Sequence, residues 1–521
     1  MASQVQATNS MSKPMQRRLF FIGLTLAVAV RVVFLLPSEL DFRNFAFRDV
    51  GSFQHVDRLI GLGLHPGVDF GFTYGLLPVL LQHMYFAVFG AGQWPTLGVL
   101  VIYLLAMVAF WILFLREFGP TLTNFGVFLG LLSMTIYIDP WPPTPAHVLM
   151  QLSLAYCLYF LLKQRLSLAL LIAALGTLTI PSLPIALTGL IALVIAREWW
   201  RGPRRTLRRL ATQFGPAAVA YAAAVLVMAV FFGWRSVLPS LVPVGGAKLY
   251  RAMNYGILGQ GKFFLHPPGA NLSYYLFTIA GIWILCSGLL VVFGCVGALR
   301  LATAPRKQGH TLFVVVCCVL HLVFVFVAFG NYLSYVYYSF LLAAGILAGV
   351  SELRSRRWRI AVSSLVLVLG LLSQVGAFKA GLQLWRSESR SPATGFLYAP
   401  NDFQAEWSSV LSFAQNRRVF LIAYGMGVEY YYPQIGTPQS WFLMPGLLLP
   451  REDSYVAQQI RTADVVVEER EVTTHFIDDN KEWQAALAIF PVQVSGKYFR
   501  IYTKDRTAAS ELTKTAAFNT R

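Results

Sequence analysis

The sequence predicts an all-α polytopic membrane bundle of about 11 transmembrane helices, followed by a small C-terminal α/β domain. Three observations predict this fold class. The 521 residues are 56% hydrophobic and 13% charged with a mean hydropathy of +0.58, long apolar runs recur up to residue 380, and the composition changes after it. Because soluble domains carry roughly 25% charged residues, lipid must surround most of this chain.

The N-terminal end is predicted to be a cytoplasmic tail, residues 1–18, followed by a first span at residues 19–37. Basic residues precede this apolar run, Arg31 interrupts it, and no small-residue cleavage site follows it. A transmembrane helix therefore explains the run better than a cleaved signal peptide does.

Eight further apolar runs are long enough to cross a bilayer, which takes about 20 residues, or about 17 in a tilted or shielded helix. They are residues 97–115, 121–138, 147–162, 213–233, 273–299, 311–329, 332–350 and 360–379. Two stretches leave alternatives open. Residues 76–90 form a short run, and residues 166–196 are cut by Pro181 and Pro184, which break helices.

The distribution of charge distinguishes two topologies. In the first, residues 76–90 span the membrane and residues 166–196 form one helix; in the second, residues 76–90 lie along the interface, and 166–179 and 182–196 are two short spans. The second places the basic groups before residue 210 on the side of the N-terminal tail, as the positive-inside rule requires. These groups are Arg116, Lys163, Arg165 and the cluster at residues 197–209. We adopt the second topology; both contain eleven spans and place the C-terminal domain outside the cytoplasm.

A first large outer loop is predicted at residues 38–96. Within it, apolar residues recur at helical spacing, which predicts an amphipathic helix on the membrane surface that begins near Asp49. They are Phe53, Val56, Ile60 and Leu64. The same loop gathers Asp49, His55, Asp57, His65 and Asp69 within 21 residues of a protein that otherwise avoids charge. Ionisable groups beside a bilayer indicate a functional site.

A second large outer loop is predicted at residues 234–272. It carries four basic residues and no Asp or Glu, against the positive-inside trend: Arg235, Lys248, Arg251 and Lys262. An outward basic loop indicates an anionic partner, such as a phosphate group at the level of the lipid headgroups. The alternative is that these side chains only snorkel from an interfacial helix.

Residues 381–505 are predicted to form a small extracytoplasmic α/β domain, and residues 506–521 a flexible tail. Short apolar runs that read as strands alternate there with helical patterns. The predicted strands are Val419–Ala423, Val465–Val467 and Phe499–Tyr502, and the predicted helices are Glu452–Arg461 and Lys481–Ile489.

Several classes of function are disfavoured. The chain contains no GxxxxGK[ST] loop and no glycine fingerprint between a strand and a helix, so a donor other than a soluble nucleotide is expected. All five cysteines lie in apolar runs and no Cys/His cluster suggests zinc, so no cofactor and no metal ligand are predicted, although a divalent metal stays open. Basic clusters interleaved with apolar runs favour membrane lipids over nucleic acid as the partner.

The first loop carries a pattern that can be compared with a known family. It reads Asp49-Val50-Gly51, Gly63, His65-Pro66-Gly67-Val68-Asp69-Phe70 and Tyr74-Gly75-Leu76-Leu77-Pro78, with Tyr137-Ile138-Asp139-Pro140 further on. This pattern resembles the first outer loop of GT-C fold glycosyltransferases, nearest to the protein O-mannosyltransferases and the lipid A aminoarabinose transferases. The resemblance covers residues 19–380 in architecture. A lysine that some relatives carry before the Pro-Leu is absent here.

The resemblance implies an integral membrane glycosyltransferase of the plasma or inner membrane. It would move a sugar from a polyprenyl-phosphate donor to a lipid, glycan or protein acceptor on the outer face, with inversion. An acceptor hydroxyl needs a general base, and the family position falls on Asp49, whose alternative role is to cap the helix. Asp69 and Asp139 are the other candidate catalytic carboxylates, each with a turn as the alternative.

The resemblance also implies cations around the departing polyprenyl phosphate. The candidates for binding the donor phosphate are Lys248, Arg251 and Lys262, and the candidates for binding substrate are His55 and Tyr74. Two other functions fit the sequence: a transporter or flippase of a lipid-linked saccharide, and a catalytically inactive assembly partner. A transporter would show charged or broken helices at mid-membrane depth.

Overall fold

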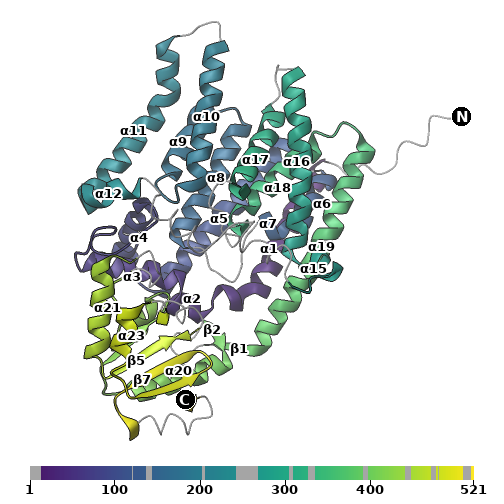
Figure 1. Cartoon of the computed structure of the whole chain (residues 1–521). Helices are drawn as coiled ribbons and strands as arrows, with labels where there is room; N and C mark the ends of the chain where they lie inside the picture. The colour runs from purple at the N-terminus through teal and green to yellow at the C-terminus, as the bar shows by residue number, and fades with distance from the viewer. Residues whose placement is uncertain are drawn as a thin grey trace, which may run out of the picture.

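The computed structural model is a long helical bundle with a mixed α/β unit at one end (Figure 1). It describes residues 13–119, 121–135, 144–201, 206–241, 268–303, 309–326, 335–390, 397–440, 448–470, 477–478, 480–507 and 518–520. The bundle helices are α1 (Lys13–Glu39), α5 (Gln93–Phe118), α6 (Leu122–Gly130), α7 (Leu132–Thr135), α8 (Pro145–Leu162), α9 (Leu166–Gly176), α10 (Ser182–Arg201), α11 (Leu207–Phe232), α16 (Ile279–Thr303), α17 (Gly309–Phe326), α18 (Tyr335–Ser351) and α19 (Arg356–Ser387). Shorter helices are α2 (Phe42–Phe47), α3 (Asp49–Gly61), α4 (Leu76–Phe89), α12 (Trp234–Ser240) and α15 (Leu272–Phe277).

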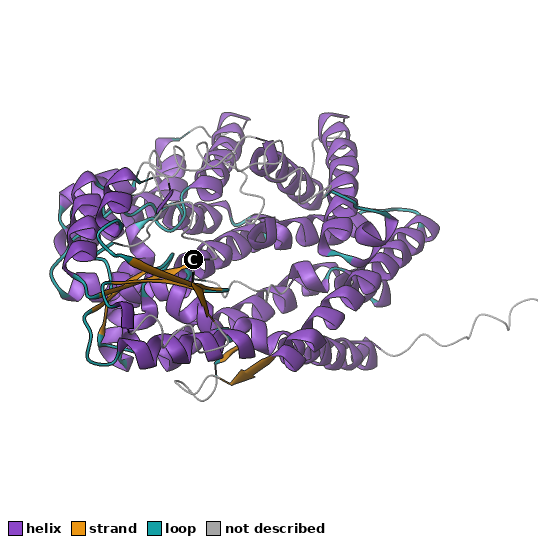
Figure 2. Cartoon of the chain, turned by 60° about the horizontal axis from the view of Figure 1, so that its bottom comes forward, coloured by secondary structure: helices purple, strands orange, loops and turns teal. Residues whose placement is uncertain are grey.

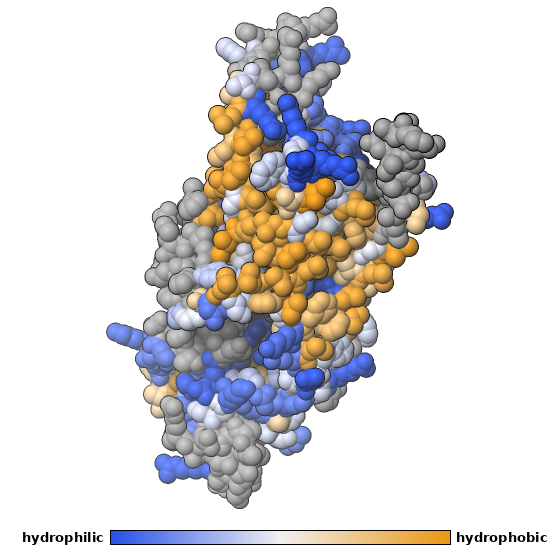
Figure 3. Space-filling model, turned by 90° about the vertical axis from the view of Figure 1, so that its right-hand side faces the viewer, coloured by the Kyte–Doolittle hydropathy of each residue, from blue (hydrophilic) through white to orange (hydrophobic). Residues whose placement is uncertain are grey.

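The bundle has the surface of a membrane protein. Six helices in the described ranges are long and apolar enough to cross a membrane, and five shorter helices are also apolar. On the face drawn in Figure 3 an apolar band covers this part of the molecule, with hydrophilic residues bordering it at both ends. Large apolar side chains such as Leu105, Val230 and Val292 are exposed on the bundle, as expected where lipid replaces water.

Aromatic side chains fill the interior of the bundle. The rings of Phe110, Trp111, Phe114 and Phe128 are fully buried. Trp111 meets Phe114 and Phe128 edge to face at 5.6 and 5.7 Å between ring centroids, an arrangement that aromatic pairs favour. The bundle is therefore packed like a protein core and is not a loose association of helices.

The predicted span at residues 121–138 is interrupted. The structure has α6 and α7 with a break at Leu131, and residues 136–138 lie outside the described residues. Next to the break α6 approaches α19 so closely that a Cβ on Gly370 would lie 1.8 Å from the carbonyl oxygen of Gly130. Both positions need glycine, because a side chain would push the two backbones apart.

Residues 166–196 form two helices, as predicted. The chain breaks between α9 and α10, and the two helices pack against each other. The break is tied to α4, because the amides of Gly75 and Leu77 donate to the carbonyls of Thr179 (2.7 Å) and Leu178 (3.2 Å). With 14 residues, α4 is about 21 Å long, which is short of the hydrocarbon thickness of about 30 Å.

Helix α3 corrects the expectation of a surface helix. Of the predicted apolar positions Phe53 and Val56 are buried and Ile60 is half-buried, but Gln54 and His55 on other sides of the helix are buried too. The helix is covered on more than one side because the C-terminal unit packs on it. The helix also ends at Gly61, before the predicted apolar position Leu64.

The C-terminal unit is built on a six-stranded sheet of order β4-β3-β5-β7-β6-β8, with a separate β1–β2 pair (Figure 2). Strands β3, β4 and β5 run parallel, and β7, β6 and β8 follow antiparallel. The strands are β1 (Glu388–Arg390), β2 (Tyr398–Pro400), β3 (Val419–Ile422), β4 (Ile435–Gly436), β5 (Val465–Glu469), β6 (Val492–Gly496), β7 (Phe499–Thr503) and β8 (Phe518–Thr520). The helices are α20 (Asn401–Ala414), the 3-10 turn η2 (Gly427–Tyr430), α21 (Pro450–Thr462) and α23 (Lys481–Leu487).

The predicted strands correspond to β3, β5 and β7, and the predicted helices to α21 and α23. Helix α20 and the remaining strands were not predicted from the sequence. Two boundaries need correction. Helix α19 continues to Ser387, past the predicted boundary at residue 380, and leads directly into β1. The predicted loose tail is wrong for residues 518–520, which pair with β6, because an edge strand offers unpaired amides and carbonyls.

The two faces of the sheet are covered by different helices. Since side chains alternate along a strand, Phe420 and Ile422 point to one face and Val419 and Leu421 to the other. The first face shares a hydrophobic cluster with α21, α23 and α3, and the second with α20 and α2. The outer loop before α4 is therefore part of the C-terminal unit, with α2 on one side of the sheet and α3 on the other.

Candidate active site

The corner between α2 and α3 meets the end of strand β3. The amide of Gly425, just after β3, donates to the carbonyl of Phe47 at 2.7 Å. A Cβ on Gly51 would lie 2.9 Å from the amide nitrogen of Gly427, and a Cβ on Gly427 would lie 2.4 Å from the Cα of Gly51. Glycines on both sides thus let the two backbones touch, and the corner that begins α3 is fixed on the C-terminal unit.

Asp49 is the first residue of α3 at this corner. The N-cap position belongs to Arg48, and no side-chain capping hydrogen bond forms there, so Asp49 does not act as the predicted cap. Its carboxylate is partly buried, and among the described residues no group donates a hydrogen bond to it. Burial raises the pKa of Asp49 to about 6, with the charge of Arg48 acting in the opposite direction. Asp49 is therefore ionised at neutral pH and is a competent proton acceptor.

Aromatic rings lie beside the first turns of α3. Tyr74 stacks on Phe53 with 5.7 Å between ring centroids and 17° between planes, and Phe72 meets Tyr74 at 6.2 Å. On its other side Tyr74 contacts His147, near the start of α8, at 5.6 Å. Tyr74, a candidate for binding substrate, thus joins α3 to the bundle one helical turn from Asp49.

His55 is held within the protein at both ring nitrogens. Nε2 lies 2.9 Å from the carbonyl oxygen of Pro438, and Nδ1 lies 2.7 Å from Oε1 of Glu429, while Thr437 donates to the other oxygen of that carboxylate. Burial lowers the pKa of His55, and Arg58 of α3 pairs with the same carboxylate of Glu429. This geometry makes His55 a link between α3 and the C-terminal unit and leaves no ring nitrogen for a substrate.

Asp69 also makes contacts within the protein. Its carboxylate accepts a hydrogen bond from the amide of His65, four residues earlier, at 2.7 Å and pairs with Arg451 of α21 at 3.4 Å. The buried Glu452 accepts from the amide of Gly71 at 2.8 Å in the same turn. Asp69 follows the end of α3, whereas Asp49 begins it, so the structure does not bring the two carboxylates together.

The remaining predicted site residues are not part of the described ranges. Asp139, Lys248, Arg251 and Lys262 all lie outside the described residues. Within those ranges, no group of three or more His, Cys, Asp or Glu side chains is arranged to hold a metal ion. An oxygen of Asp57, the third carboxylate of the sequence pattern at residues 49–69, lies 2.8 Å from Nδ1 of His83.

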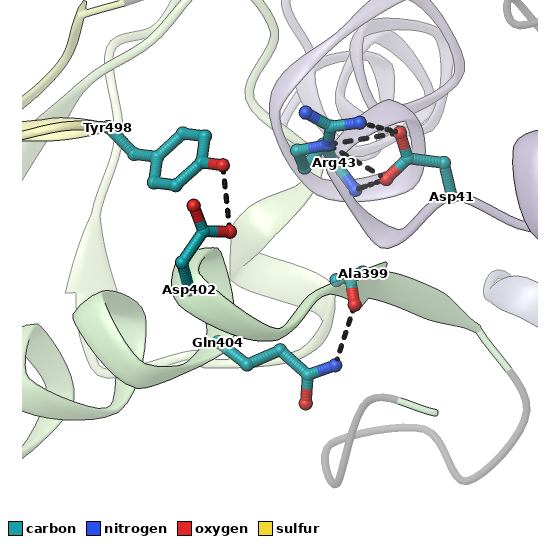
Figure 4. A network of polar contacts seen from close by, with 6 residues as sticks. All are labelled: Asp41, Arg43, Ala399, Asp402, Gln404 and Tyr498. Atoms are coloured by element: carbon teal, nitrogen blue, oxygen red, sulfur yellow. Dashed lines mark hydrogen bonds and ion pairs between the residues drawn. The ribbon is translucent and has the colours of Figure 1, made fainter. Parts of the chain in front are cut away.

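A polar junction that the sequence did not reveal lies where α1 meets the C-terminal unit (Figure 4). The buried carboxylate of Asp41 accepts three hydrogen bonds of 2.8 to 3.1 Å from the guanidinium of Arg43. Burial, with the nearby charge of Asp41, raises the pKa of Glu388 to about 7, and Arg43 acts in the opposite direction. The only sequence signal was the short Asp-x-Arg spacing, because Glu388 is far away in the chain.

The fold is shared with a protein of known structure. The crystal structure of ArnT from Cupriavidus metallidurans bound to undecaprenyl phosphate matches with 13% identity over 93% of this chain and 98% of that chain, at a TM-score of 0.51. The apo state of that protein matches with 14% identity over 94% and 99% of the two chains, at a TM-score of 0.48. The Archaeoglobus fulgidus oligosaccharyltransferase in complex with zinc and sulfate matches with 11% identity over 92% and 72%, at a TM-score of 0.44.

No family model matches the chain, and no curated protein sequence is similar to it at a significant level. The likeness to ArnT, a lipid A aminoarabinose transferase, therefore shows the fold alone. The chain is a multi-pass membrane protein with the GT-C fold. This confirms the fold predicted from the first-loop pattern.

Proposed function

We propose that the chain is a glycosyltransferase that moves a sugar from a polyprenyl-phosphate donor to a lipid, glycan or protein acceptor. Two things support this proposal: the fold is that of ArnT, a protein with a structure bound to undecaprenyl phosphate, and Asp49 has the properties of a general base. The observation that carries most weight is the carboxylate of Asp49, which is desolvated and accepts no hydrogen bond within the described ranges.

In the proposed reaction Asp49 takes the proton from the acceptor hydroxyl as its oxygen attacks the anomeric carbon of the sugar. The bond from that carbon to the phosphate oxygen breaks, and the polyprenyl phosphate leaves with the electron pair, so the anomeric centre is inverted. Cations next to the departing phosphate stabilise its added negative charge. For this role we propose Lys248, Arg251 and Lys262, with Asp139 as a second carboxylate of the site.

Two of the other first-loop residues have proposed supporting roles. The ring of Tyr74 lies beside the first turns of α3, and such a ring can pack on a sugar, so we keep Tyr74 as a substrate-binding residue. Asp69 is proposed to act indirectly by holding the turn at residues 65–71 on α21. Because both nitrogens of His55 have protein partners, we propose for it a positioning role only.

The proposed topology has eleven crossings, with residues 76–90 along the interface and the N-terminus in the cytoplasm. The positive-inside distribution of the basic residues before residue 210 supports it, and so does the division of residues 166–196 into α9 and α10. By length alone α4 and α9, with 14 and 11 residues, are both shorter than a full crossing of the hydrocarbon. The C-terminal unit and the α2–α3 corner then share the extracytoplasmic side. That placement agrees with a donor and acceptor that meet outside the cytoplasm.

The test is transfer of radiolabelled sugar from polyprenyl-phosphate donors to membrane acceptors by the purified protein. Asp49→Asn is expected to lower the rate by about 10²–10⁴-fold, as for loss of a general base. Wild-type transfer is expected to rise as the pH passes through about 6 and to level off above it, because Asp49 must be ionised. Asp57→Asn, on the same helix, is the matched control and is expected to keep most of the activity.

The outcomes separate the alternatives. Equal activity of Asp49→Asn and wild type would remove Asp49 from the reaction and make Asp139 the next candidate base. Absence of transfer by the wild type with every donor, at full folded yield, would favour a transporter of a lipid-linked saccharide or an inactive assembly partner. Donor binding measured separately shows whether a loss of transfer comes from chemistry or from binding.

A further inference from the structure

A polar pocket lies at the end of the bundle farthest from the C-terminal unit. It has a volume of about 550 Å³ and is lined by residues from α8, α16, α17, α18, α19 and the turns beside them. Its charged lining residues are Arg300, Glu352, Arg354 and Arg359, and His310 lies among them. Helix α19 separates this pocket from the C-terminal unit by its length of 32 residues, about 48 Å. The pocket is therefore distinct from the site at Asp49.

The pocket is basic. Three arginines and one glutamate among its described lining residues give a formal charge of +2, with His310 neutral. Glu352 neutralises only part of it, since Arg300 lies 3.8 Å and His310 3.5 Å from its oxygens. The Arg300 distance exceeds the roughly 2.7–2.9 Å of a strong charge-assisted hydrogen bond, so this arginine has capacity for another anion.

Two of the arginines have donors left over. Arg359 donates to the carbonyl of Leu353 at 2.7 Å, but its Nε is buried and has no partner among the described residues. Arg354 makes no hydrogen bond or ion pair within the described ranges. A buried guanidinium nitrogen without an acceptor is costly, and a phosphate oxygen in the pocket would satisfy it.

The rim of the pocket belongs to the membrane. Leu299 precedes Arg300, and Trp358 and Ile360 flank Arg359; all three apolar side chains are exposed on the bundle surface. Tryptophan beside basic residues is typical of the headgroup level of a bilayer. An anion in this pocket can therefore remain attached to acyl chains that lie along the apolar surface.

We propose that this pocket binds the phosphate headgroup of an anionic lipid, at the membrane surface opposite the proposed active site. The phosphate lies between Arg354, Arg359 and Arg300, and the acyl chains follow the exposed apolar face of α16 and α19. This proposal does not depend on the proposed transferase function, because the pocket and its cations are separate from Asp49.

The test uses delipidated protein in detergent and measures binding of phosphatidylglycerol by native mass spectrometry and by the shift of thermal unfolding. The double variant R354Q/R359Q is expected to bind this lipid about tenfold more weakly than wild type, because each charge-assisted hydrogen bond to the phosphate contributes to the binding free energy. R356Q/R357Q is the matched control: it removes the same charge from residues that lie between Arg354 and Arg359 in the sequence, outside the pocket lining. It is expected to bind as the wild type does.

A variant with a gain of binding keeps the test independent of folding. E352Q removes the negative charge that competes for Arg300, so phosphatidylglycerol is expected to bind about threefold more tightly. Equal weakening by both double variants, or weaker binding by E352Q, would overturn the proposal. Inorganic phosphate that protects the protein as well as the lipid does, or equal binding of phosphatidylcholine, would also overturn the assignment to an anionic lipid.

Discussion

Replacing Asp49 by asparagine is expected to stabilise the protein at neutral pH while it removes transfer. Burial raises the pKa of Asp49 from 3.8 to about 6, so the folded state holds this carboxylate in its charged form only at a cost. Each pKa unit is worth 1.36 kcal/mol, so the cost above pH 6 is at most about 3 kcal/mol. An asparagine amide in the same place carries no charge, and part of this cost disappears.

The raised pKa of Asp49 determines how its contribution to stability changes with pH. A raised pKa means that the folded state binds the proton more tightly than the unfolded state, so this contribution to stability is present near pH 4 and is lost as the pH rises through about 6. Asp49→Asn should therefore unfold at a higher temperature than wild type at pH 7.5, by about 1–3 kcal/mol of free energy, and match it near pH 4.

The measurement is thermal unfolding in detergent by tryptophan fluorescence at both pH values. Asp402→Asn is the control of opposite sign: partial burial acts the other way, but hydrogen bonds from Lys497 and Tyr498 lower the pKa of Asp402, so its loss destabilises at neutral pH. A lower unfolding temperature for Asp49→Asn at pH 7.5 would refute the argument, because the carboxylate would then be stabilised by its surroundings.

Two further predictions concern the attachment of α3 to the C-terminal unit. His55→Ala leaves the carboxylate of Glu429 buried without its ring partner and should cost about 2–4 kcal/mol of unfolding free energy. The control is His65→Ala at an exposed position, which should change the unfolding free energy by no more than about 0.5 kcal/mol. Denaturant unfolding measures both variants, and equal effects would contradict a role of His55 in joining α3 to the C-terminal unit. Gly427→Ala forces a Cβ against the backbone of Gly51 and should lower both stability, by about 1–3 kcal/mol, and sugar transfer. Gly61→Ala at the end of α3, whose Cβ would meet nothing within 4 Å, is the control and should lower neither. A fully active Gly427→Ala would contradict the close contact.

The sequence predicted the parts of the fold that depend on local pattern. Hydropathy located the membrane helices because each long apolar run is its own signal, and charge at the helix ends favoured two helices in residues 166–196. Strands β3 and β5 were found because both faces are buried, which makes them continuous apolar runs. Strands β1, β4 and β8 are two or three residues long and show no period, so no pattern could reveal them.

The sequence predicted less of the site, because its contacts join distant parts of the chain. Asp49 was found from a local pattern, but the pair of His55 and Glu429 spans 374 positions, and nothing in either neighbourhood points to the other. The same holds for Arg31 in α1, which is buried and donates to Gln374 of α19 at 3.3 Å. In the sequence, a histidine close to several aspartates suggests a substrate ligand. Only the packing of α3 in the structure shows that His55 instead binds the C-terminal unit.

The placement of α2 and α3 on opposite faces of one sheet explains how the carboxylate of Asp49 is kept desolvated. A short helix on a loop would rotate so that Asp49 reached water, because ionised groups favour solvation. The backbone contact of Gly51 with Gly427, the bond from Gly425 to Phe47, and the hydrogen bonds of His55 prevent that rotation. The C-terminal unit is therefore expected to control the pKa of Asp49 by holding the corner, even though it contributes no carboxylate to the proposed reaction.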